Sequence, residues 1–169
     1  MTSPSAPAPG VLVVGAAGTE YRLAMPHLLP QAIDPSSMLA EARRLLGIST
    51  DATASPAAAQ SRSRAAFMLL CAGRAAEARV VLLEAIQAQR AFRDEKSLTS
   101  SELRLVQVLQ QLDRPIEAVA LARKTLARHD ARSDMRHYAL HHLGKALLQS
   151  GSCVEARVNR TGFRGGLLA

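Results

Sequence analysis

Apolar residues recur every three or four positions over most of residues 34–160, which is the spacing of one face of an α-helix. The first such stretch begins at Asp34 and Pro35, a capping residue followed by one that fits the first helical position. Gly47 follows the last apolar residue of the stretch. The pattern therefore predicts an amphipathic helix over residues 35–46.

After a polar linker the pattern repeats in the segments LLCAGRAAEARVVLLEAI, VLQQLDRPIEAVALARKTL and ALLQSGSCVEARVNRTGF. In each segment an apolar helix end meets a glycine or an aspartate, and a Glu-Ala pair a few residues later opens a second helix. The alanines of these pairs, Ala78, Ala118 and Ala156, are 40 and 38 residues apart. We therefore expect three helical hairpins, at about residues 56–92, 99–129 and 133–160.

The repeated residues have physical roles in such hairpins. The turn residues must tolerate a left-handed backbone, as glycine and aspartate do, and they are Gly73, Asp113 and Gly151. The alanines are small enough for the second helix to cross close to the first. Helices are expected to start at Ser55-Pro56, at Pro115 and at Thr99, whose spacing to Glu102 is that of a capping box.

The repeats resemble the tetratricopeptide repeat family, whose units of two antiparallel helices stack into a curved array. The Leu-Gly pair of the family's first helix is matched by Leu143-Gly144, and less well by Leu105-Val106 and Ala65-Ala66. The large residue three positions later is Leu69, Leu109 and Leu147. The resemblance covers residues 60–160 and implies an all-α fold, a short α-solenoid of antiparallel helical hairpins.

Two features depart from the family pattern. The period is about 40 residues instead of the usual ~34, which is similar to the long-helix variants found in signalling regulators and motor light chains. In the third unit, Gly162, Gly165 and Gly166 fall where the second helix should run. Either that helix is short or the C-terminus is truncated or altered relative to a longer array. An incomplete last unit leaves an apolar face uncovered, so we expect self-association or marginal stability.

Residues 1–33 do not follow the helical pattern. The first ten are rich in Ser, Pro and Ala, and the sequence VLVVGAAGTEYRL then predicts a short strand and a glycine turn. Pro26 and Pro30 prevent a long helix after this turn. We therefore expect a largely disordered or loosely structured segment over residues 1–33, a helical domain over 34–160 and a disordered tail over 161–169.

The resemblance also implies a binding surface, because the first helix of each unit lines the concave groove of such arrays. By position the groove residues are Arg64, Phe67, Arg104, Gln107, Gln110, Tyr138, His141 and Lys145, with Ser63, Leu103, His142 and Gln149 beside them. This polar-to-basic set suits an extended or helical peptide with acidic groups. Phe67 and Leu103 are equally well explained as packing residues. The family's carboxylate clamp needs Asn partners, which are missing beside Lys145.

The charge distribution points to an acidic partner. The net charge is +7, and residues 61–169 hold eighteen Lys and Arg against ten acidic residues. Such a surface attracts acidic proteins or polyanions, although arginine is also an ordinary solvated residue on helix surfaces. Only 3% of the residues are aromatic, which disfavours stacking on nucleic-acid bases. Two cysteines without disulfide spacing, and the lack of a long apolar run near the N-terminus, favour a soluble cytoplasmic protein.

Few residues suit catalysis or metal binding. His137 and His141 lie one helical turn apart near Asp134, which makes them weak metal candidates, but a closed structural site needs four ligands. Cys71 is expected to be a buried thiol and Cys153 an exposed one. The glycine turn near the N-terminus lacks the βαβ unit of a nucleotide site. We expect neither enzymatic activity nor a cofactor.

These features favour a protein-protein interaction module, an adaptor or chaperone-like protein that binds a peptide or helix of a partner in the polar-basic groove. One alternative is a regulatory or sensor fragment of a signalling or transcriptional regulator. Another is a weak nucleic-acid binder that uses its basic surface, although nucleic acid is the less favoured partner. We expect no membrane partner.

Overall fold

The computed structural model describes residues 13–14, 19–24, 29–51, 55–130, 133–153 and 156, and this part of the chain is mostly helical. In chain order the helices are α1 (Pro35–Asp51), α2 (Pro56–Cys71), α3 (Ala75–Ala91), α4 (Glu95–Gln111), α5 (Pro115–Leu126) and α6 (Asp134–Gln149). Three short strands precede them: β1 (Val13–Val14), β2 (Tyr21–Ala24) and β3 (Leu29–Ala32). The predicted predominance of helix is confirmed, and the strands add a small sheet to it.

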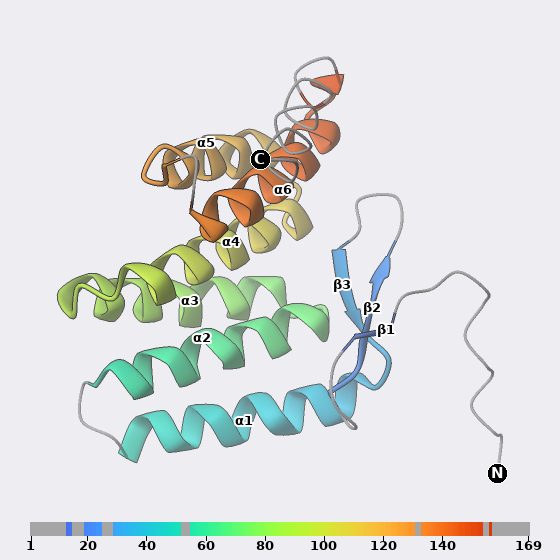
Figure 1. The fold of residues 1–169 in the computed structure, drawn as a ribbon. Coiled ribbons are helices and arrows are strands. Elements are labelled where there is room, and N and C mark those ends of the chain that lie inside the picture. Colours follow the sequence, from blue (N-terminus) through green and yellow to red (C-terminus); the bar gives the residue numbers. More distant parts are fainter. Residues whose placement is uncertain are drawn as a thin grey trace, which may run out of the picture.

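Each helix packs against the next one along the chain, and α4 also contacts α2 and α6. Figure 1 shows this stack, which begins with α1 and ends with α5 and α6. The sheet lies to one side of the stack, where β3 contacts α2. A continuous hydrophobic core runs through the stack from Ala42 on α1 to Ala156 beyond α6. Ala78 and Ala118, which were predicted at helix crossings, are both 0% exposed. Their small side chains allow close packing of neighbouring helices.

The helices α2, α3, α4 and α6 end in the same type of turn. The turn residues have positive φ angles: 77° at Gly73, 55° at Arg93, 56° at Asp113 and 81° at Gly151. In each turn the next N–H donates to a carbonyl five residues earlier, as Arg74 does to Leu69 at 2.9 Å and Asp94 to Gln89 at 3.1 Å. These left-handed caps confirm the three predicted turns. The fourth turn, at Arg93, was not predicted, because arginine rarely adopts a left-handed backbone.

Most of the predicted helix starts are confirmed. The backbone N–H of Ser36 donates to the Asp34 carboxylate at 2.9 Å, and that of Ala58 donates to the Ser55 hydroxyl at 3.1 Å. Pro115 occupies the first turn of α5, where its missing N–H costs nothing. α1 continues past Gly47, because an exposed glycine inside a helix weakens it without ending it.

The start predicted at Thr99 is wrong. α4 begins four residues earlier, at Glu95, and its capping residue is Asp94, which accepts a hydrogen bond from the Ser97 N–H at 3.1 Å. Thr99 and Glu102 are both buried within the helix. A capping box and a polar stripe on a helix share the same spacing, so the local pattern alone does not distinguish them.

The Glu-Ala pairs have a second function at the starts of α3 and α5. Glu77 pairs with Arg74, and Glu117 pairs with Arg114 at 2.5 Å, so the same ion pair recurs 40 residues apart. Both glutamates lie in the first turn of their helices, where a negative charge is favourable. Each arginine directly follows a left-handed turn residue, and the ion pair therefore joins the turn to the helix after it.

The sheet contains the short strand predicted near Val13, and it adds β2 and β3 to a segment that was expected to be disordered or loosely structured. β2 pairs with β1 on one side and with β3 on the other, both antiparallel, and Tyr21 lies opposite Ala32. On one face Arg22 donates to the Gln31 side chain at 3.1 Å, and both residues are exposed. On the other face Pro30 and Ala32 are buried against the helices. Packing on the stack therefore stabilises strands that are too short to be stable alone.

Several expectations lie outside the described residues, namely those for residues 1–12, for the glycine turn at residues 15–18, for most of the last hairpin's second helix and for the tail over 161–169. Among the helices that are described, none combines the length and apolar character that a membrane crossing requires. Cys71 is buried and Cys153 is exposed, as expected.

Candidate functional site

The predicted groove residues lie on α2, α4 and α6, three helices that are in contact in that order. We call the surface that they form the α2–α4–α6 face, and its members are Arg64, Phe67, Arg104, Gln107, Gln110, Tyr138, His141 and Lys145. Three of these residues are buried, namely Gln107, Gln110 and Lys145. Tyr138 is 61% exposed, and Arg64 and His141 are also exposed. The face therefore consists of an exposed rim and a polar, buried floor.

Arg104 joins α4 to α2 in the floor of this face. Its Nη1 atom donates to the Ser63 hydroxyl at 2.6 Å, and the Ser63 and Ser101 hydroxyls are 2.7 Å apart. The Arg104 guanidinium also lies over the Phe67 ring, with Cζ 5.8 Å from the ring centroid. This is a cation–π contact, which is strongest where water is excluded.

The sheet covers the same end of the face. The Tyr21 ring meets the Phe67 ring edge to face, at a centroid distance of 5.2 Å and an interplanar angle of 83°. The Gln111 side chain donates to the backbone carbonyl of Pro30 at 3.2 Å, which fastens β3 to the end of α4. Phe67 is thus a packing residue, while its role in a binding groove stays a prediction.

The Arg104 guanidinium at this end of the face is largely removed from water, and this affects its pKa. Burial and the nearby charge of Arg64 lower the pKa of Arg104, while Tyr21 acts in the opposite direction. Burial raises the pKa of Tyr21, and it raises that of Cys71 to about 12. Within the described part of the chain no carboxylate pairs with Arg104. Its positive charge is therefore not neutralised by an ion pair within the described residues.

The contact between α4 and α6 is a polar seam. Gln149 donates through Nε2 to the backbone carbonyl of Gln110 at 2.9 Å. Both side-chain atoms of Gln110 are buried without a hydrogen-bond partner among the described residues, and so is Oε1 of Gln149. Buried amides that lack partners are uncommon and costly, so those at this seam suit a ligand or water.

Lys145, His141 and His142 complete the α6 side. Burial lowers the pKa of Lys145 to about 8. Burial and the neighbouring His141 and Lys145 charges lower the pKa of His142 to about 3, so His142 is neutral near pH 7. The His141 and His142 rings meet edge to face at 5.4 Å. In the described residues, no three His, Cys, Asp or Glu side chains are arranged to hold a metal ion, and this includes the candidates His137 and His141.

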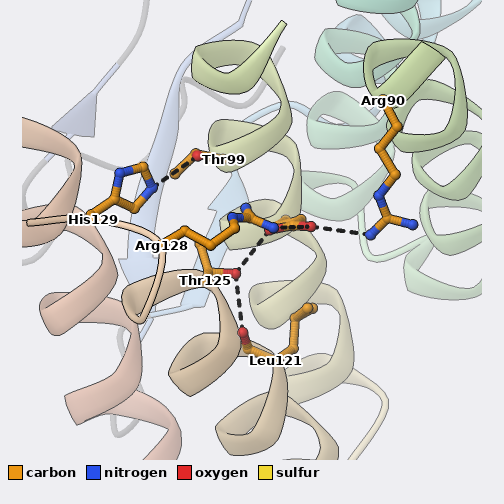
Figure 2. Close-up of polar contacts among 7 residues, drawn as sticks. Arg90, Thr99, Leu121, Thr125, Arg128 and His129 are labelled. Carbon is orange, nitrogen blue, oxygen red and sulfur yellow. Dashed lines mark hydrogen bonds and ion pairs between the residues drawn. The ribbon is translucent and has the colours of Figure 1, made fainter. Parts of the chain in front are cut away.

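Sequence reasoning missed the most extensive ionic network of the described chain, which is centred on Glu102. Its carboxylate accepts hydrogen bonds from Arg90, Arg128 and Thr125, and these three residues are labelled in Figure 2. Arg90 donates at 3.2 Å, one nitrogen of Arg128 at 3.1 Å and the Thr125 hydroxyl at 3.0 Å. Beside it, the Thr99 hydroxyl and Nε2 of His129 are 3.0 Å apart. The network joins α3, α4 and the end of α5.

A separate apolar cleft of about 370 Å³ lies between α1 and α3, and none of the predicted groove residues lines it. Its walls are mainly aliphatic, and Arg43, Arg74 and Glu77 stand among them. Val80, one of the lining residues, is 58% exposed, so the cleft opens to solvent. It shows no unpaired buried polar group of the kind found on the α2–α4–α6 face.

Comparison with protein-family models, with curated proteins and with solved structures finds no match to the chain.

Proposed function

We propose that the chain is a protein-binding module that holds an extended acidic segment of another protein on the α2–α4–α6 face. The observation that carries this proposal is Arg104, a partly buried cation whose described partners are a hydroxyl and an aromatic ring. A desolvated guanidinium binds a carboxylate more strongly than a solvated one does, because the low local dielectric strengthens the ion pair.

The buried amides support the same proposal. The side chain of Gln110 offers one donor pair and one acceptor, both without a partner in the described chain. A peptide backbone supplies the complementary donor and acceptor, so an extended segment that enters between α4 and α6 satisfies the amide without any particular side chain. Two exposed residues of the same face support this further, since Arg64 adds a positive charge and His141 adds a polar ring.

The helix arrangement fits a short solenoid of antiparallel hairpins similar to tetratricopeptide repeats, and we include this architecture in the proposal. It is supported by the recurring left-handed turns and by the Arg74–Glu77 and Arg114–Glu117 pairs, which repeat after 40 residues. An adaptor or chaperone-like role follows from such a surface. A reducing compartment such as the cytoplasm suits the free thiols of Cys71 and Cys153.

A defined probe tests the proposal. A fluorescently labelled oligo-glutamate peptide is titrated with the full chain, and fluorescence anisotropy gives the affinity. Arg104→Gln and Arg64→Glu are expected to weaken binding at least about tenfold, because each removes a charge-assisted contact. Substitutions of Lys124, an exposed residue of α5 away from the face, are the matched controls: Lys124→Glu has the charge change of Arg64→Glu, and Lys124→Gln has that of Arg104→Gln. Both controls should retain binding within about twofold.

A single-stranded oligonucleotide measured under the same conditions distinguishes the proposal from nucleic-acid binding. Tighter binding of the oligonucleotide, with a steep loss of affinity on adding salt, would contradict a protein-binding role. Equal effects of Arg104→Gln and Lys124→Gln, or of Arg64→Glu and Lys124→Glu, would show instead that only the net charge of the chain matters.

A further inference from the structure

The Phe67–Arg104 end of the α2–α4–α6 face already holds an extended strand, the chain's own β2. Tyr21 of this strand contacts the Phe67 ring, and its hydroxyl is close enough to Arg104 and Cys71 for their charges to influence its pKa. Tyr21 is only partly buried by these contacts. The site is therefore shaped for an aromatic ring that has a polar tip and is carried on extended backbone.

The way in which the strands attach indicates what the surface recognises. Side chains of β2 and β3 alternate, so that Tyr21 and Ala32 face the helices while Arg22 and Gln31 face solvent. The backbone is recognised as well, through the hydrogen bond from Gln111 to the Pro30 carbonyl at 3.2 Å. An aromatic anchor combined with a backbone contact is a common form of peptide recognition.

The attachment is also limited in extent. β2 and β3 have four residues each and β1 is described with two, and strands of this length need packing partners to stay formed. Among the described residues, the hydrophobic cluster that fixes them to the helices has Ala32, Met38 and Cys71 as its buried members, and Pro30 of β3 is buried as well. A partner with better contacts can therefore displace the sheet at a modest cost in free energy.

We propose that the Phe67–Arg104 end of the face is a binding site for an extended strand that presents a tyrosine, and that β2 and β3 occupy it until a partner strand of this kind displaces them. This inference rests on the proposed function and specifies the partner segment. The acidic residues of that segment extend from the tyrosine toward Gln110 and Lys145.

The chain itself supplies the probe for the test. A labelled synthetic peptide with the sequence of residues 19–33 is titrated with the full chain in its wild-type form and as Tyr21→Ala. The variant, whose internal strand has lost its anchor, should bind the peptide at least about tenfold more tightly than the wild type, because its site is free for a larger fraction of the time. The same peptide with its tyrosine replaced by alanine should lose this binding.

Ala32→Asp gives a second variant, in which a charge at a buried position loosens the chain's own β3 while Phe67, Arg104 and Gln111 of the site remain. It should also increase peptide binding, because the site is then free for a larger fraction of the time, and it keeps the test decisive if Tyr21→Ala does not fold. Equal peptide affinity of the wild type and Ala32→Asp, or equal binding of the peptides with and without tyrosine, would overturn the inference.

The two proposals fail in different ways. If oligo-glutamate binds with the expected sensitivity to Arg104→Gln but the 19–33 peptide does not bind any variant, the tyrosine-strand site is wrong and the proposed binding of acidic segments stands. If neither peptide binds to any form of the chain, both proposals are wrong.

Discussion

Replacing Glu102 with glutamine tests the ionic network that joins α3, α4 and α5. Glu102 is 1% exposed, while its partners Arg90 and Arg128 are 55% and 30% exposed. Glutamine has nearly the same shape, so the substitution leaves no cavity. It removes the charge, and its amide nitrogen takes the place of an oxygen that accepts from Arg128 and Thr125. Two donors then face each other in a buried position.

The magnitude follows from how far each group is from water. Removing one member of a fully buried ion pair typically costs about 3–5 kcal/mol, because the remaining charge is left unpaired without solvent. Here both arginines reach solvent and can be partly rehydrated, so we expect Glu102→Gln to lower the free energy of unfolding by about 2–4 kcal/mol.

Urea unfolding followed by far-UV circular dichroism measures this difference directly. Glu77→Gln, which breaks the exposed pair with Arg74, is the matched control and should change the stability by less than about 0.5 kcal/mol. A cycle with Arg128→Met should then give a coupling of more than about 1 kcal/mol with Glu102→Gln. Additive effects, or a Glu102→Gln protein as stable as the control, would refute the network as a source of stability.

Three other predictions concern single groups. Arg93→Gly should stabilise the fold by about 0.5–1 kcal/mol in the same urea assay, since φ is 55° there, whereas Gly73→Ala should destabilise it by about 1–2 kcal/mol; the opposite signs would refute the assignment of left-handed turns. His142 has a pKa of about 3, below its ordinary value, so the unfolded state binds more protons than the folded state at mildly acidic pH. The free energy of unfolding should therefore be constant above pH ~6.5 as far as this residue is concerned, and it should fall by up to about 1.4 kcal/mol per pH unit below that value. His142→Leu should reduce this slope. Lys145 has a pKa lowered to about 8, so the unfolded state binds more protons between that value and its ordinary pKa; stability should rise with pH across this window, and Lys145→Met should abolish the rise in pH-dependent melting.

The elements that could be predicted from the sequence are those with a local physical cause. Gly73 and Gly151 were identified because a left-handed backbone favours glycine, and Ala78 because close helix packing excludes larger side chains. Arg93 adopts the same backbone for a nonlocal reason: the chain must reverse after α3 to place α4 against it. The arginine side chain gives no indication that the chain reverses at this position.

Beyond the short strand predicted near Val13, the sheet was missed, and so was the Glu102 network, for a related reason. Pro30 excluded a long helix in its segment but did not predict a strand; it lies on an edge strand, where a missing N–H costs little. Glu102 was assigned to a helix cap because its sequence neighbours include Thr99, whereas its actual partners come from α3 and α5. Of the candidate site, the sequence indicated which helices form the face and that it is polar, but not that Tyr21 covers part of it.

The positions of these features along α4 separate stability from binding. Thr99 and Glu102 in its first half hold α3 and α5, whereas Arg104 and Gln111 in its second half hold α2 and the sheet. Because the first half is fixed by charged hydrogen bonds, the sheet can leave the second half without releasing the helix. Glu102→Gln should therefore lower the unfolding free energy while the affinity for the 19–33 peptide stays unchanged. Tyr21→Ala should instead raise the affinity for the peptide and leave the unfolding free energy unchanged. A variant that changed the affinity and the unfolding free energy together would show that α4 responds as one unit.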